Sequence, residues 1–123
     1  MPLRAADARR TVTPNATMTT LASPTQGGSA TSLWRVDMAA GARGPEHVFD
    51  VEQLWTVLSG RVAFDVDGAE VTLDPGDTIV LPAGAARRVS CEADAVLYVC
   101  GAGAGVVRVV GEAAPRGTPA WIA

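Results

Sequence analysis

The sequence predicts an all-β domain, either a sandwich or a closed barrel, on three observations. Short β-branched and apolar segments recur at intervals of about 8–12 residues, separated by turns rich in glycine and proline. No segment combines helical periodicity with capping residues. The chain has 123 residues, of which 48% are hydrophobic, enough to form the core of one domain.

The expected strands alternate apolar and polar residues or are continuously β-branched. In chain order they cover residues 31–38, 54–58, 61–66, 70–73, 78–81, 87–90, 95–99 and 106–110. Asp67-Gly68 predicts a tight hairpin turn whose second residue needs a positive φ, and residues 74–77 predict another turn. Residues 101–105 are glycine-rich, but β-branched residues follow them, so we expect an inter-strand turn and not a phosphate loop.

The two ends differ in composition from the middle of the chain. We expect residues 1–15 to form a flexible N-terminal arm, residues 16–112 the β-barrel, and residues 113–123 a tail that packs on the barrel or on a partner. The part beyond Thr11 could add an edge strand or exchange with a partner. Trp121 is expected on the outside of the barrel or against a second copy, and not in a site.

Charge and cysteine content exclude several classes of function. The net charge is −3 and no basic run exceeds two residues, so nucleic acid is not an expected partner. No apolar stretch approaches the roughly 20 residues of a membrane span, and no signal peptide precedes the domain, so we expect a cytoplasmic protein. All ten basic residues are arginine, which is typical of a GC-rich bacterial genome. If their segments form a hairpin, Cys91 and Cys100 lie roughly 16 Å apart, too far for a disulfide, so we expect both to be reduced. They also lack Cys-x-x-Cys spacing, so we expect no zinc site.

The segment from residue 41 to residue 60 has a specific spacing. Five residues separate Gly41 from His47, and twelve residues separate His47 from Gly60. This spacing resembles the first motif of the cupin superfamily, which reads Gly, five residues, His, one residue, His, three or four residues, Glu, six residues, Gly. Phe49 stands where that motif has its second His, and Gln53 where it has Glu.

A second segment resembles the other cupin motif, which reads Gly, five residues, Pro, one residue, Gly, two residues, His, three residues, Asn. Gly76, Pro82 and Gly84 are in register, whereas Arg87 replaces the His and Cys91 the Asn. The resemblance covers roughly residues 30–110. It implies a single-domain cupin, a double-stranded β-helix or jelly-roll barrel, with degenerate metal-binding motifs.

In cupins the motif side chains point into the barrel, so the resemblance implies that Arg87 points to the same place as His47. Strand parity puts Phe49, Gln53 and Trp55 on the side of His47, and it aims the neighbouring glutamates away. Phenylalanine cannot ligate a metal, arginine is a cation without an acceptor, and glutamine is a weak neutral ligand. We therefore predict no bound metal and no cofactor.

These residues suit chemistry on a carbonyl compound. Arg87 could bind a carboxylate, enolate or phenolate oxygen, and His47 could exchange protons near neutral pH. Gln53 could donate to a carbonyl, with Phe49 and Trp55 as apolar walls. The predicted function is a metal-independent small-molecule pocket protein: an accessory isomerase, dehydratase or cyclase of bacterial secondary metabolism, acting on a carbonyl or polyketide-like compound.

Several alternatives stay open. One is a non-catalytic binding or sensor cupin for an anionic or enolisable ligand, and another is a metal-dependent cupin oxygenase or isomerase with atypical ligands. His47 could merely satisfy hydrogen bonds, Gln53 could be a remnant of a lost metal site, and Arg87 could form an internal salt bridge. We also expect a homodimer, because the β-capable segment from Thr17 to Ala22 needs a sheet edge.

Overall fold

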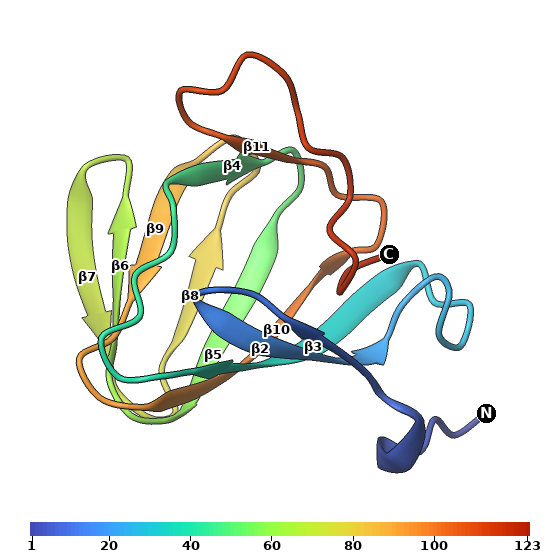
Figure 1. Ribbon diagram of the computed structural model, residues 1–123. Coiled ribbons are helices and arrows are strands. Elements are labelled where there is room, and N and C mark those ends of the chain that lie inside the picture. The colour runs from blue at the N-terminus through green and yellow to red at the C-terminus, as the bar shows by residue number, and fades with distance from the viewer.

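The computed structural model describes residues 1–123 and consists of two antiparallel sheets that face each other (Figure 1). One sheet has the strand order β1-β2-β3-β10-β5-β8 and the other β11-β4-β9-β6-β7. The strands are β1 (Arg9–Val12), β2 (Ala16–Ala22), β3 (Thr31–Met38), β4 (His47–Phe49), β5 (Gln53–Ser59), β6 (Val62–Val66), β7 (Ala69–Leu73), β8 (Thr78–Leu81), β9 (Ala86–Ser90), β10 (Ala95–Ala102) and β11 (Val107–Val109). The all-β jelly-roll prediction is confirmed.

The alternation of the long strands explains how the sheets pack. Along β3, every second side chain is buried, so Trp34, Val36 and Met38 point between the sheets. Leu97 and Val99 do the same on β10, the central partner of β3 and β5. Burying each such apolar side chain contributes about 1.5–3 kcal/mol, which favours this register over a one-residue slip.

Two predicted turns form as expected. Asp67 has φ 49° and Gly68 φ 85°, the pair of positive φ values that a two-residue hairpin turn needs, here between β6 and β7. The N–H of Asp77 donates to the carbonyl of Asp74 at 3.0 Å and closes the turn between β7 and β8.

All four motif glycines have positive φ: Gly41 81°, Gly60 79°, Gly76 92° and Gly84 84°. At Gly60 space is also restricted, because a Cβ there would lie 2.4 Å from the carbonyl oxygen of Asp94. At Gly84 a Cβ would meet nothing within 4 Å. The glycine framework of the motifs is therefore set by backbone conformation, reinforced at one position by a close approach.

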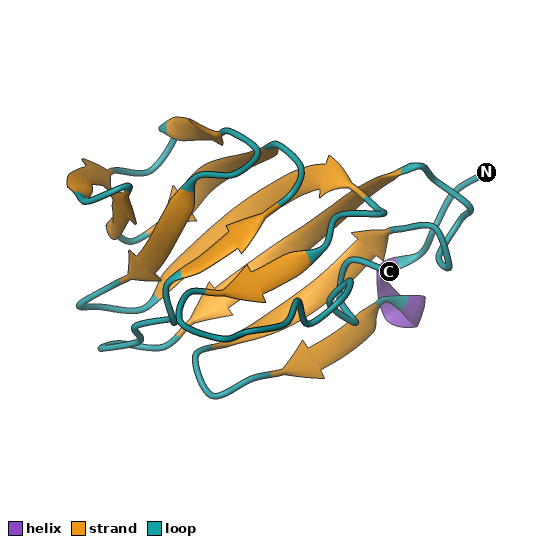
Figure 2. Cartoon of the chain, turned by 90° about the horizontal axis from the view of Figure 1, so that it is seen from above, coloured by secondary structure: helices purple, strands orange, loops and turns teal.

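Three strands are absent from the sequence-based assignment, among them β2, which covers the β-capable segment from Thr17 to Ala22. Arg9–Val12 forms β1 and pairs with β2, so the sheet begins within the segment assigned to the arm. The three-residue β4 follows a loop containing glycine and proline, and its pairing with β9 brings His47 opposite Arg87. Seen from above, most of the strands run diagonally across the molecule, and a short 3-10 helix, η1 (Ala5–Asp7), lies outside them (Figure 2).

The chain beyond β11 returns across the open side of the barrel to the large sheet (Figure 1). There the hydroxyl of Thr20 donates to the carbonyl of Trp121 at 2.7 Å, and that of Ser32 donates to the carbonyl of Ile122. Ile122 is 1% exposed and belongs to the core.

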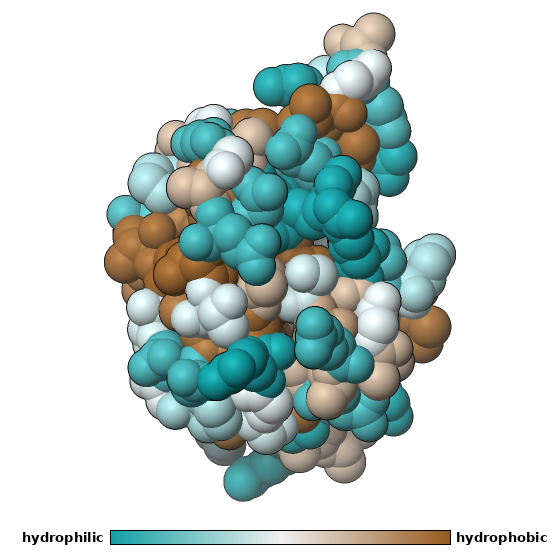
Figure 3. Space-filling model, turned by 90° about the vertical axis from the view of Figure 1, so that its left-hand side faces the viewer, coloured by the Kyte–Doolittle hydropathy of each residue, from teal (hydrophilic) through white to brown (hydrophobic).

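No helix in the structure is long and apolar enough to cross a membrane. On the side of the molecule that carries β6 and β7, hydrophilic residues surround a patch of apolar ones (Figure 3).

Candidate functional site

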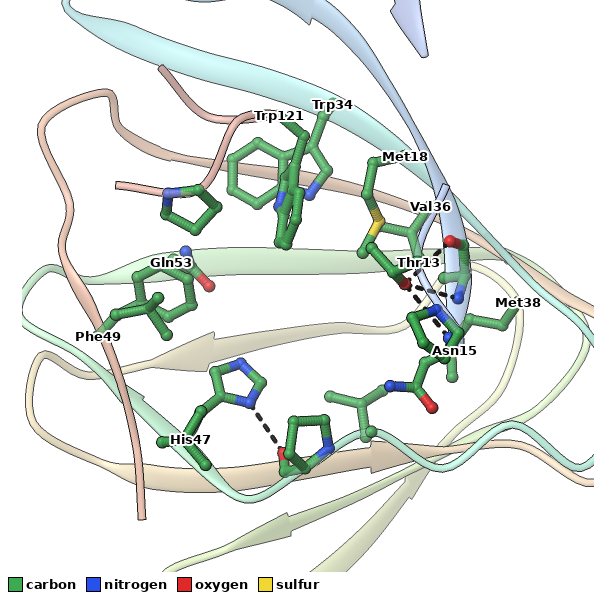
Figure 4. Close-up of a pocket in the computed structure, with 18 of the residues that line it drawn as sticks. Thr13, Asn15, Met18, Trp34, Val36, Met38, His47, Phe49, Gln53 and Trp121 are labelled. Atoms are coloured by element: carbon green, nitrogen blue, oxygen red, sulfur yellow. Dashed lines mark hydrogen bonds between the residues drawn. The ribbon is translucent and has the colours of Figure 1, made fainter. Parts of the chain in front are cut away.

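A cavity of about 560 Å³ lies between the two sheets (Figure 4). Both sheets, the turn between β1 and β2, and the C-terminal tail contribute to its wall. More than half of the lining residues are hydrophobic, and they include all three tryptophans of the chain: Trp34, Trp55 and Trp121. A cavity of this size with a few polar groups is typical of small-molecule sites.

His47 projects from β4 into this cavity (Figure 4). Its Nδ1 lies 2.9 Å from the carbonyl oxygen of Pro45, and because a carbonyl can only accept, Nδ1 carries the hydrogen. In the neutral imidazole, Nε2 therefore has the free lone pair. Burial lowers the pKa of His47, the bond to Pro45 partly opposes this, and the charge of Arg87 lowers it further. His47 is thus a neutral base at neutral pH.

Gln53 lies on β5 and is only 1% exposed. Its Oε1 accepts two hydrogen bonds, from Arg87 Nη2 at 3.0 Å and from Trp55 Nε1 at 3.1 Å. These two donors fix the orientation of the amide, and its Nε2 donates to no protein group. Because Gln53 lines the cavity, the amide presents an N–H donor to a bound molecule.

Arg87 is completely buried, yet it is not among the residues that line the cavity. Its guanidinium carbon lies 4.7 Å from the centre of the Phe49 ring, and Nη2 bonds to Gln53. Nε and Nη1 have no hydrogen-bond partner. Burial lowers the pKa of Arg87 to about 10, so the group remains charged at neutral pH. No carboxylate pairs with it, so the internal salt bridge considered from the sequence does not form.

The structure brings together four of the five residues singled out from the sequence. His47, Phe49, Gln53 and Trp55 line the cavity, and Arg87 lies behind two of them. Phe49 also packs edge-on against His47, with ring centres 5.5 Å apart. The guanidinium of Arg87 therefore contacts the cavity only indirectly, by a hydrogen bond to Gln53 and by packing over the ring of Phe49.

The expectation that Trp121 lies outside the site is wrong, because this side chain lines the cavity (Figure 4). Hydrogen bonds from Thr20 and Ser32 to the carbonyls of Trp121 and Ile122 hold this part of the main chain against the large sheet, which directs the indole inward. Met18 and Asn15 are further lining residues that sequence reasoning missed. Neither belongs to a motif, so no sequence signal marks them.

The donor set does not fit the metal ion that many cupins hold. His47 is the only imidazole, and the Oε1 of Gln53 already accepts from two N–H groups. Glu46 and Glu52 do not line the cavity. No group of three or more His, Cys, Asp or Glu side chains is arranged to hold a metal. The nearby guanidinium would also repel a cation.

Comparisons with known proteins agree with this architecture. The cupin domain family matches residues 34–101, more than half of the chain. The structure is similar to the polyketide cyclase RemF from Streptomyces resistomycificus, with a TM-score of 0.79 and 17% identity over 92% of this chain and 87% of that one.

Two further solved structures are similar at the level of the fold. An RmlC-like cupin from Shewanella frigidimarina has a TM-score of 0.71 and 17% identity, over 82% of this chain and 88% of that one. Salicylate 1,2-dioxygenase from Pseudoaminobacter salicylatoxidans has a TM-score of 0.73 and 18% identity, but 85% of this chain covers only 31% of that one. A search of curated proteins found no match. The family match, with the two sheets and the motif glycines, shows that this chain belongs to the cupin domain family.

Proposed function

We propose that the protein is a metal-independent enzyme of proton transfer, an isomerase, dehydratase or cyclase, acting on a carbonyl compound in the central cavity. One observation carries the proposal. The Nδ1–H of His47 is held by the Pro45 carbonyl, so a neutral base with a free Nε2 lines the same apolar cavity as the unpartnered amide N–H of Gln53.

These two groups suffice for enolisation. His47 Nε2 takes the proton from the carbon next to a carbonyl, and the electron pair of that C–H bond moves to the carbonyl oxygen. The amide N–H of Gln53 donates to the oxygen as its negative charge develops. The imidazolium then returns the proton to another carbon, which gives an isomer, or to a departing hydroxyl, which gives water. In a cyclase the enolate carbon would attack a second carbonyl of the same molecule.

Arg87 supports this chemistry without touching the substrate. Its charge is buried behind Gln53, and a positive potential from a buried group stabilises an enolate more than the same charge in solvent would. The same charge lowers the pKa of His47 and keeps the base unprotonated. Arg87 is therefore a positioning residue. The sequence suggested that it binds the substrate directly, whereas in this proposal it orients and polarises the amide of Gln53.

The substrate class rests on the cavity wall and on the similarity to RemF. The aromatic and aliphatic lining favours a ring-containing carbonyl compound. The name of RemF describes a polyketide cyclase, and at 17% identity that name supports, by analogy, a polyketide-like substrate for this chain.

Hydrogen–deuterium exchange tests the proposal without knowledge of the natural substrate. The probe is 2-tetralone, an aromatic ketone with acidic protons next to its carbonyl, followed by NMR in deuterated buffer. The wild-type protein should accelerate exchange, and His47→Asn should lose about 10²–10⁴-fold of that acceleration. Gln53→Leu should also slow exchange, while Tyr98→Phe on the outer face of β10 serves as the matched control. Exchange no faster than in buffer, or unchanged in His47→Asn, would refute the proposal.

One observation favours a second candidate, a non-catalytic binding protein. Among the titratable side chains, only His47 and Arg116 line the cavity, and Arg116 is paired with Glu112. No second proton-transfer group accompanies His47. A protein that binds aromatic ketones but leaves their exchange rate unchanged would be this binder.

A further inference from the structure

The C-terminal tail supplies a wall of the cavity that neither cupin motif includes. Four side chains fix its last three carbonyl groups to the large sheet and to the loop between β2 and β3. The hydroxyl of Thr20 donates to the main-chain oxygen of Trp121 at 2.7 Å, and that of Ser32 donates to the main-chain oxygen of Ile122. A main-chain oxygen of Ala123 accepts from the Thr25 hydroxyl and from Arg9 Nη2, both at 2.7 Å. With Ile122 buried in the core, the indole of Trp121 is held in place rather than loosely attached.

The cavity also carries N–H donors on β3, on β5 and on the tail that have no acceptor in the protein. Of the three indole N–H groups, only that of Trp55 donates within the protein, to Gln53. Those of Trp34 and Trp121 have no protein partner, and neither atom is sealed off from the cavity as the orphan nitrogens of Arg87 are. The amide nitrogen of Gln53 is a third donor of this kind. A tryptophan N–H in a buried setting normally finds an acceptor, and a molecule bound in the cavity can supply one here.

Charge argues that this molecule is neutral. Arg116 is the only permanently charged side chain that lines the cavity. Its guanidinium forms a salt bridge with the carboxylate of Glu112. Arg87 is separated from the cavity by Gln53 and Phe49. Oxygen atoms of ketones or phenols satisfy N–H donors without the desolvation penalty that a carboxylate would incur in this apolar wall.

We propose that the cavity binds a planar, neutral aromatic ketone or phenol whose oxygen atoms face the indole N–H groups, with Trp121 as the specificity-determining residue. The proposal rests on the proposed function in taking the central cavity as the ligand site, and it adds the ligand class and the residue that selects it. Trp121 contributes a flat face for the ring system and a donor at its edge (Figure 4).

Isothermal titration calorimetry with two neutral probes separates planarity from simple hydrophobicity. 1,8-Dihydroxyanthraquinone has three coplanar fused rings, with three of its four oxygen atoms along one edge. Testosterone has a comparable ring system with a ketone and a hydroxyl, but it is not planar. The wild-type protein should bind the anthraquinone at least about tenfold more tightly than testosterone, since only the planar molecule can lie against the indoles.

Three variants separate the roles of Trp121. Trp121→Phe keeps an aromatic face but loses the donor, and it should weaken anthraquinone binding about threefold to tenfold. Trp121→Ala removes both and should weaken binding about tenfold to hundredfold. Tyr98→Phe is the control outside the cavity and should bind as the wild type does. Circular dichroism melts check that each variant is folded, and Trp121→Phe keeps the test valid if the alanine variant is not.

Wild-type affinity in both Trp121 variants would overturn the inference, and so would failure of the wild type to bind the anthraquinone. Equal affinity for testosterone would also overturn it. The exchange reaction of 2-tetralone is measured on the same samples. If binding depends on Trp121 but no exchange occurs, the enzymatic proposal is refuted and this inference stands. If exchange occurs but the Trp121 variants bind as the wild type does, this inference is refuted and the enzymatic proposal stands.

Discussion

The turns of this barrel and the walls between them have changed to different extents relative to the cupin motifs. At the turns, Gly41, Gly60, Gly76 and Gly84 all stand where the motifs have glycine, and all four adopt positive φ. On the walls, three of the four motif positions that usually hold a metal carry Phe49, Gln53 and Arg87. The turns are constrained by backbone conformation, which few residues can adopt. The walls only have to fill the interior, so their chemistry can change without loss of the fold.

The largest predicted effect concerns the turns. Gly60→Ala should lower the free energy of unfolding by about 2–5 kcal/mol, because alanine is strained at φ 79° and its Cβ would collide with the Asp94 carbonyl. Gly84→Ala is the matched control, since it has a similar φ but open space, and it should lose about 1–2 kcal/mol. Urea denaturation measures both. Equal losses would show that the close approach at Gly60 contributes nothing.

The next effect concerns the wall and has the opposite sign. Arg87 is a buried charge without a counter-ion and with two unpartnered nitrogens. Arg87→Met removes the charge and keeps an apolar chain of similar length, so it should raise the free energy of unfolding by about 1–4 kcal/mol. The same variant should slow 2-tetralone exchange, because Gln53 loses one of its two donors.

Arg61→Met is the control for that variant, because Arg61 forms only an exposed pair with Asp74. It should change stability by less than about 1 kcal/mol. Destabilisation by Arg87→Met would mean that the guanidinium stabilises the fold. The interior position 87 would then be constrained by stability, as the turn glycines are, which contradicts the comparison.

A smaller effect concerns the tail. Thr20→Val removes the hydroxyl that donates to the Trp121 carbonyl and preserves the shape of the side chain. We expect a loss of about 1–2 kcal/mol, because the carbonyl loses its hydroxyl donor in a part-buried setting. Faster amide hydrogen exchange near residues 119–123 should accompany the loss. Thr72→Val, on an exposed strand position, should leave the tail unchanged.

The smallest effect is the dependence of stability on pH. The pKa of His47 in the folded protein lies below its usual value of about 6.5. Between these two pKa values the unfolded chain binds more protons at His47, so the contribution of His47 to stability is constant above about pH 6.5 and falls as the pH decreases below it. His47→Asn should lose this part of the acid sensitivity. The difference in urea midpoint between the two proteins, followed from about pH 7.5 to pH 5, isolates it, and a constant difference would contradict the assigned pKa direction.

Local sequence signals predicted most of the fold. The strands at Thr31–Met38 and Thr78–Leu81 form residue for residue, because alternation and turn residues define both ends. Asp67-Gly68 likewise predicted its hairpin. The sequence did not predict β4 as a separate strand, because its three residues are too few to show a period and only the pairing with β9 stabilises it.

The site could be predicted only in part. Strand parity and the motif register placed His47 and Gln53 in the interior, since both depend on local spacing. Trp121 could not be placed, because it reaches the cavity through hydrogen bonds to residues about 100 positions earlier in the chain. Arg87 points inward as the resemblance implied, but Gln53 and Phe49 separate it from the cavity, an arrangement that depends on how long side chains pack across two sheets.

The central claim is that His47 acts as a base without a metal ion. The most direct test measures 2-tetralone exchange by protein purified without chelators, together with its transition-metal content by elemental analysis, before and after addition of zinc, iron(II) or manganese. We predict that exchange occurs without stoichiometric metal, that added metal does not increase it, and that His47→Asn abolishes it. One metal ion per chain that is lost in His47→Ala, with exchange appearing only in the metal-loaded protein, would contradict the claim.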